Sequence, residues 1–366
     1  MNRILQYAIE QAASDIHITE EQVSWVRIRG ELHRWGEPVS LAAIDEWVEL
    51  FVPNVQTVYA KLRSKQQMTP IDSAFQYASR RFRMNVYRGM NGINLALRLL
   101  SNRILPLHEL YLPEALKQFT KLTAGLFLVA GTTGSGKSTT LASMLDHINH
   151  SRSENILTVE QPIEYIHTPD LCRITQMEVG VHTESFAAAT VAAMRQNPNI
   201  LLVGELRDLE TMQNAVTLAE TGHVVYATLH AKSVTDTIDR MVDVFPPKQQ
   251  EQIRLQLSGV LRGILHQRLL RGSGGMVPLV ELLAVDDVIA AMIAGKQKAN
   301  SIRDHLRSKV AFGNVHAADN AAWHIQNGRI SLEAVMPYLS RDDCAMTQAI
   351  VGTETTRRGL HGKPSF

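Results

Sequence analysis

The chain has 366 residues, 45% of them hydrophobic and 20% charged, which is typical of a globular protein of two or three domains. Its formal net charge of +1 argues against nucleic acid as a partner, and Cys172 and Cys344 offer neither a disulfide framework nor a four-thiolate zinc site. Without a signal-peptide pattern or an apolar run of roughly 20 residues, we expect a cytoplasmic protein with no direct membrane span.

Residues 1–100 are predicted to form a separate α+β domain. Its clearest strand, over residues 81–86, alternates apolar with polar side chains, and residues 93–100 form the return strand. The apolar face holds Phe82, Met84 and Val86. The polar face carries Arg81, Arg83 and Asn85. We therefore expect a half-buried strand with a basic outer face.

Residues 101–113 contain two prolines and few periodic signals, so we interpret them as a linker. Residues 114–351 then alternate apolar runs with helical patterns, which favours a mostly parallel sheet covered by helices on both faces. From about residue 234 the pattern becomes largely helical, and the dense apolar spacing of residues 255–265 predicts a buried helix. The polar residues 352–366 are expected to be a disordered tail.

One stretch of this second domain carries a specific chemical signal. The buried-strand pattern of residues 126–130 runs into Gly131-x4-Gly136-Lys137-Ser138, the P-loop pattern, and a helical pattern follows. Glycines let backbone N–H groups converge on phosphate oxygens, Lys137 adds a charge, and the Ser138 hydroxyl can ligate Mg²⁺. We therefore predict ATP and Mg²⁺ as ligands. The binding residues are Gly131, Thr132, Thr133, Gly134, Ser135, Gly136, Lys137, Ser138 and Thr139.

Hydrolysis also needs a group that orients water. The apolar run 200–203 leads to Glu205, which we select as the base because strand ends beside a P-loop face the γ-phosphate. The run 156–159 leads to Glu160 and Glu164, one of which is expected to reach Mg²⁺ or its water shell.

Two histidines, His223 and His230, flank the predicted strand 224–229. At a spacing of seven they point to opposite faces of a regular strand, so they need not share a role. The alternative for each is an ordinary hydrogen-bonded structural residue.

These motifs occur in an order that resembles the secretion-ATPase superfamily, and within it the PilT-like retraction ATPases of type IV pili. Residues 131–139 resemble its Walker A motif, 160–164 its Asp box, 201–211 its Walker B motif and 221–230 its His box. The resemblance covers residues 5–285. It implies a RecA-like P-loop core, a PAS-like N-terminal domain and a helical C-terminal region.

The resemblance also implies roles for individual residues. Glu205 would be the catalytic glutamate and Glu164 the Asp-box carboxylate, with His223 and His230 close to the nucleotide. The arginines of the N-terminal domain that reach the nucleotide would be Arg81, Arg83 and Arg98.

The implied protein is a homohexameric ATP-hydrolysing motor that works at the inner membrane through a pilus platform protein. Pilus retraction is the first expectation, and a PilT-like secretion or pilus-assembly ATPase is the alternative. Departures at Gln161, Asn197 and Asn199, where the family has carboxylates, favour a third hypothesis of a nucleotide-gated scaffold with little hydrolysis. Residues 287–293 also depart from the retraction signature.

Overall fold

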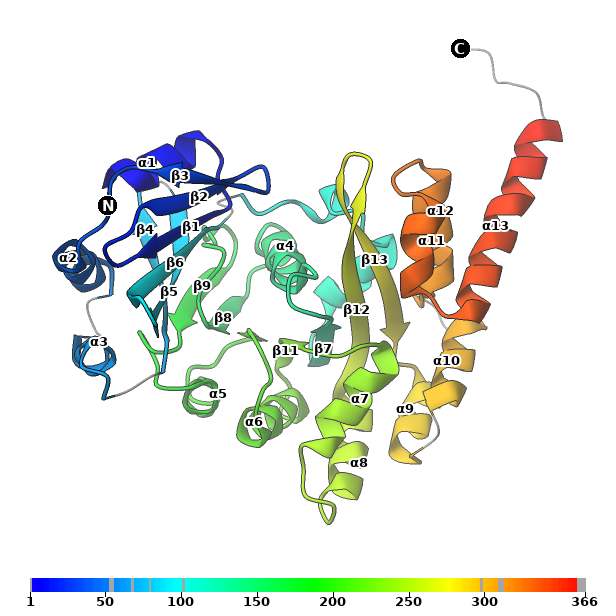
Figure 1. Cartoon of the computed structure of the whole chain (residues 1–366). Helices are drawn as coiled ribbons and strands as arrows, with labels where there is room; N and C mark the ends of the chain where they lie inside the picture. The colour runs from blue at the N-terminus through cyan, green and yellow to red at the C-terminus, as the bar shows by residue number, and fades with distance from the viewer. Residues whose placement is uncertain are drawn as a thin grey trace. The chain divides into compact units, whose positions relative to one another are not determined.

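A computed structural model describes residues 2–52, 56–66, 69–78, 80–100, 103–296, 299–308 and 313–360. The chain divides into two compact units, which we describe separately (Figure 1). The first contains Met1–Ile104 together with two later segments, Val159–His167 and Gln176–Ser185, and the second contains the rest. The later segments were predicted to belong to the P-loop domain, so the unit boundary is not a single point in the sequence.

The first unit is built on a six-stranded antiparallel sheet in the order β3-β2-β1-β6-β5-β4. The strands are β1 (Asp15–Thr19), β2 (Ser24–Ile28), β3 (Glu31–Trp35), β4 (Ile71–Tyr77), β5 (Arg80–Gly89) and β6 (Gly92–Leu99). The helices are α1 (Asn2–Glu10), α2 (Leu41–Phe51) and α3 (Gln56–Arg63). The alternation predicted for residues 81–86 is confirmed, because Phe82, Met84 and Val86 are completely buried.

The second unit is built on a seven-stranded sheet in the order β13-β12-β7-β11-β10-β8-β9. The strands are β7 (Gly125–Ala130), β8 (Asn155–Glu160), β9 (Arg173–Glu178), β10 (Ile200–Val203), β11 (Val224–Leu229), β12 (Leu261–Gly272) and β13 (Gly275–Ala284), of which the ends of β8 and β9 belong to the first unit by their contacts. Strands β10, β11, β7 and β12 are mutually parallel, while β13 is antiparallel to β12. An α/β fold with a largely parallel sheet is therefore confirmed.

Helices connect and flank these strands. They are η1 (Leu107–Glu109), η2 (Glu114–Lys121), α4 (Lys137–Asn149), α5 (Phe186–Ala193), α6 (Leu209–Glu220), α7 (Val234–Asp243), α8 (Gln250–Val260), α9 (Asp287–Ala294), α10 (Ala299–Arg307), α11 (Ala317–Gln326), α12 (Leu332–Val335), η3 (Met336–Tyr338) and α13 (Arg341–Leu360). The core joins the apolar stripe of α4 to Phe127 of β7 and Tyr226 of β11. Leu107, within the predicted linker, is buried in the same core.

Two predictions for the C-terminal part are wrong. The buried helix expected over residues 255–265 ends with α8 at Val260, and the apolar residues that follow begin the long hairpin of β12 and β13 (Figure 1). A short apolar run fits a buried strand as well as a buried helix, and pairing with β7 decides between them. Helix α13 extends to Leu360, into the expected disordered tail, and residues 361–366 lie outside the described part.

No helix among the described residues is both long and apolar enough to cross a bilayer.

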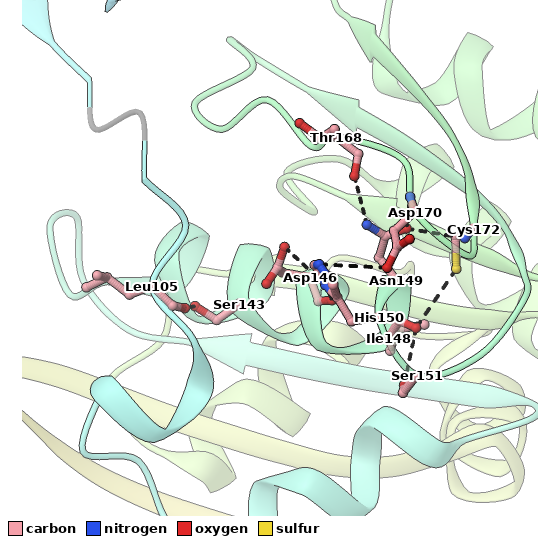
Figure 2. A network of polar contacts seen from close by, with 10 residues as sticks. All are labelled: Leu105, Ser143, Asp146, Ile148, Asn149, His150, Ser151, Thr168, Asp170 and Cys172. Atoms are coloured by element: carbon pink, nitrogen blue, oxygen red, sulfur yellow. Dashed lines mark hydrogen bonds and ion pairs between the residues drawn. The ribbon is translucent and has the colours of Figure 1, made fainter.

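The side chain of Asn149, at the C-terminal end of α4, is fully buried. Figure 2 shows its hydrogen bonds to the loop before β9. Its Nδ2 donates to the carbonyl of Thr168 at 2.8 Å, and its Oδ1 accepts from the backbone N–H groups of Asp170 at 3.0 Å and Cys172 at 3.2 Å. The Cys172 thiol donates to the carbonyl of Arg152, and burial raises its pKa. One amide therefore satisfies three backbone groups of the loop before β9.

Replacing this amide should destabilise the second unit. In Asn149→Ala, three backbone groups would lose the partner that a buried side chain supplies, and we expect the free energy of unfolding to fall by about 2–4 kcal/mol. Urea denaturation followed by circular dichroism measures the change. Ser151→Ala, which removes one exposed hydroxyl nearby, is the control and should stay within about 0.5 kcal/mol of the wild type. Equal stability of the two variants would contradict this account.

Candidate active site

The predicted P-loop connects buried strand β7 to helix α4, as the sequence pattern requires. Three of its glycines have positive φ: 151° at Gly131, 75° at Gly134 and 89° at Gly136. A Cβ atom at Gly131 would lie 2.2 Å from the backbone carbonyl oxygen of Gln267, and one at Gly136 would lie 2.7 Å from the side-chain nitrogen of the same residue. The loop is thus packed directly against β12.

Gln267 is the site residue that sequence reasoning missed. Its Oε1 accepts a hydrogen bond from the Thr140 hydroxyl in the first turn of α4 at 2.8 Å, and both side chains are buried. Its contacts with the two glycines need the pairing of β12 with β7, in which His266 lies opposite Ala130. Because the region around residue 261 was interpreted as helix, no signal pointed to this contact.

The geometry of the loop fits a polyphosphate. Lys137 donates from Nζ to the carbonyl oxygens of Gly131 and Thr132, both at 3.1 Å, so its charge is held over the loop. The Ser135 hydroxyl is buried and has no hydrogen-bond partner among the described residues, as expected of a loop shaped around a polar ligand. Ser138 follows in the first turn of α4, whose N-terminal end favours anions.

Two more predicted residues lie at the same edge of the sheet. Because β7, β10 and β11 are parallel, the residues after their carboxyl ends lie along one edge. Glu205 follows β10 and His230 follows β11, and their side chains meet with His230 Nε2 3.3 Å from Glu205 Oε1. The other carboxylate oxygen of Glu205 lies 2.6 Å from Arg207. The structure therefore brings Glu205 and His230 together on the P-loop side.

The two residues that follow Leu206 have different partners. Asp208 caps α6, accepting from the backbone N–H and the hydroxyl of Thr211, both at 2.8 Å. Arg207 contacts Glu205, the carboxylate predicted to be the base.

His223 lies at the opposite end of β11, next to Gly125 rather than next to the loop. The six residues of β11 lie between it and His230, and seven steps along a strand span about 23 Å. Its Nδ1 contacts the carbonyl of Leu218 at 3.0 Å and the Thr221 hydroxyl at 3.1 Å, at the end of α6. The expectation that His223 lies close to the P-loop is therefore not met within one chain, and its local role is structural.

Asn197 and Asn199, two of the departures from the family pattern, also lie at that opposite edge, before β10 begins. The side-chain oxygen of Asn199 accepts from the N–H of Asn155 at 2.8 Å, and the Asn155 amide donates to the carbonyl of Asn197, also at 2.8 Å. Asn197 has a φ of 50°, which asparagine tolerates well. These amides stabilise a turn far from the P-loop lysine.

The remaining predicted residues belong to the first unit. Arg83 and Arg98 are partners across β5 and β6, with half-exposed or exposed side chains. Burial raises the pKa of Asp15, but hydrogen bonds from Arg98 and Ser14 outweigh it and hold the pKa below its usual value. Arg83 lies 3.6 Å from Asp72.

The other two predicted residues of this unit are Arg81 and Glu164. Arg81 is largely buried against Glu178, and Glu164 lies in the loop after β8. In the described part of the chain, no group of three His, Cys, Asp or Glu side chains could hold a metal ion.

The comparisons with known proteins agree with this fold. The sequence matches the family described as "Type II/IV secretion system protein" over residues 1–357. The type IV pilus retractation ATPase PilT of Pseudomonas aeruginosa is 34% identical over 314 residues, 82% of this chain and 90% of that protein. A crystal structure of the pilus retraction motor PilT with bound ADP has a TM-score of 0.82 at 36% identity, covering 93% of this chain and 96% of the other.

A second solved structure, the ATPase DotB of Legionella pneumophila, has a TM-score of 0.78 at 27% identity and covers 90% of this chain and 92% of its own. The chain thus belongs to the type II/IV secretion system protein family and is an ATPase of that family, similar to PilT.

The contact between Gly131 and β12 makes a prediction about binding. In Gly131→Ala the new Cβ would meet a backbone oxygen that cannot move aside, so we expect affinity for ADP to fall about 10–100-fold. Titration of a fluorescent ADP analogue measures it. Gly134→Ala is the matched control, because the space around Gly134 is open and only backbone strain is added. Equal losses in the two variants would contradict a role for the β12 contact.

His266, beside the P-loop strand, should make stability depend on pH. Burial, with a smaller contribution from Arg268, lowers its pKa to about 4, against 6.5 ordinarily. The unfolded chain therefore binds a proton at a higher pH than the folded chain, so stability is complete above pH 6.5 and falls as the pH drops towards 4, by about 2 kcal/mol at pH 5. Urea unfolding of the wild type and His266→Gln at pH 7 and 5 tests this. An equal pH dependence in the two proteins would show that His266 is not the cause.

Proposed function

We propose that the chain is the ATP-hydrolysing motor of a type IV pilus system, with pilus retraction as its work. The observation that carries this proposal is the combination of a P-loop and a Glu205–His230 pair at one sheet edge with likeness to the retraction motor PilT over 93% of the chain. We take the folds of the two units to be PAS-like and RecA-like, respectively.

In the second unit, different residues are proposed to bind the phosphates, hold the metal ion and activate the water. Backbone N–H groups of the P-loop and the Lys137 ammonium hold the β- and γ-phosphates of ATP. The Ser138 hydroxyl would hold Mg²⁺, which supplies positive charge to the phosphate oxygens when bound. Glu205 accepts a proton from the attacking water, while His230 and Arg207 hold its carboxylate in place.

The proposed roles of the other site residues depend on assembly of several copies of the chain. We infer that the chain forms a homohexamer, in which Arg83 and Arg98 of the first unit act as the arginines that meet a nucleotide. Glu164 is assigned the Asp-box role of approaching the metal's water shell. His223 has its structural role within the chain. The motor would work in the cytoplasm, at an inner-membrane platform protein.

A PilT-like ATPase of a secretion system is the second candidate, and the likeness to DotB at a TM-score of 0.78 favours it. The scaffold hypothesis has less support, because two of its three departures, Asn197 and Asn199, stabilise a turn at the sheet edge opposite the P-loop and so do not remove a group from the site. A deletion strain distinguishes the first two: more pili without twitching indicates retraction, and unchanged pili with lost secretion indicates the second.

Replacing the proposed base should separate binding from hydrolysis. In Glu205→Gln the shape is kept but no proton can be accepted, so we expect kcat to fall about 100–10,000-fold with little change in nucleotide affinity. Phosphate release at steady state measures kcat. Glu210→Gln, an exposed glutamate in the first turn of α6, is the control and should retain turnover. Full activity of Glu205→Gln would remove this residue from the mechanism.

A further inference from the structure

A buried ion pair in the first unit lies against the loop that follows β8. The Arg81 guanidinium donates from Nη2 to Oε2 of Glu178 at 2.5 Å, and from Nε to the carbonyl of Ile163 at 2.6 Å. The same Glu178 oxygen accepts from the N–H of Ile163 at 3.1 Å. The side chains of Arg81 and Glu178 are 16% and 4% exposed. Both backbone polar groups of Ile163 are therefore held by one ion pair.

A second side chain of β9 fixes the loop a little further on. Nε2 of Gln176 donates to the carbonyl of Tyr165 at 2.8 Å, and its Oε1 accepts from the N–H of His167 at 2.9 Å. Glu164 lies between Ile163 and Tyr165, so the backbone on each side of it is anchored. The direction of the Glu164 side chain thus depends on these bonds.

We propose that Arg81 is a positioning residue, which acts through Glu178 to fix Ile163 and with it the orientation of Glu164. The proposal rests on the function proposed above for Glu164, and it differs from the resemblance, which places Arg81 at the nucleotide. Nε and Nη2 of Arg81 are both engaged within its own unit, and its side chain is 16% exposed, whereas the side chains of Arg83 and Arg98 are 39% and 65% exposed. An arginine that reaches a nucleotide must present its N–H groups outward, which Arg83 and Arg98 can do.

The first test measures the loop itself. In Arg81→Ala, hydrogen exchange of the Ile163 amide in the full-length chain should accelerate about 10-fold or more. The reason is that Glu178, which accepts from this amide, loses the arginine that holds its carboxylate in place. The His167 amide, held by Gln176, is the internal reference. Arg83→Ala, two residues along the same strand, should leave the Ile163 amide unchanged. If Arg81→Ala does not fold, Arg81→Lys takes its place, since an ammonium cannot bridge the carboxylate and the carbonyl as the guanidinium does.

The second test measures coupling in turnover. Arg81→Ala and Glu178→Ala should each lower kcat about 10–100-fold with KM for ATP changed less than about 3-fold, and the double variant should be no worse than either single one. Glu164→Gln should lower kcat by at least as much. Losses that multiply in the double variant, or a loss confined to Arg81→Ala, would overturn the proposal and favour direct contact with the nucleotide.

The two tests also separate this inference from the proposed function. Faster exchange at Ile163 with unchanged turnover would overturn a role in positioning. A wild-type chain that binds ATP but releases no phosphate would refute the proposed function, and with it any role for Arg81 in the reaction, whereas the exchange measurement would still establish whether the loop is held by this pair.

Discussion

The contact between the P-loop and β12 is the constraint on which the second unit depends. Gly131 approaches the carbonyl of Gln267 so closely that no side chain fits, and the Gln267 amide bonds the first turn of α4. A phosphate-binding loop works only if its N–H groups keep their direction without the ligand. Packing a glycine loop against a buried strand gives that rigidity, because the neighbouring strand has no freedom to move away.

The edge of the parallel sheet then gathers the reactive groups. Since β7, β10 and β11 are parallel, the P-loop, Glu205 and His230 come from separate parts of the sequence to one side of the unit. The same topology explains why some predicted residues lie away from the P-loop. Residues that precede these strands, such as His223, Asn197 and Asn199, lie at the other edge, where they bond backbone groups and stabilise turns.

The loop after β8, which carries Glu164, belongs to the first unit. That unit includes the segments Val159–His167 and Gln176–Ser185. The loop was predicted from its strand to belong with the P-loop, yet its backbone carbonyls accept hydrogen bonds from Arg81 of β5 and Gln176 of β9. A carboxylate that depends on bonds from another part of the chain can be controlled by that part. The N-terminal unit thus contributes an orienting ion pair as well as an outward basic face.

The sequence by itself determined the strand–loop–helix unit around Lys137, the basic alternation of β5, and the strand-end positions of Glu205 and His230, because these depend on local periodicity and on glycine spacing. Only the tertiary structure decided that residues 261–284 form a hairpin, that Gln267 supports the P-loop, that Arg207 contacts Glu205, and that Arg81 is buried against Glu178. Each of these is a contact between residues distant in sequence or a choice among local partners. Strand pairing and burial decide which of these contacts form, and the spacing of residues along the chain does not determine either one.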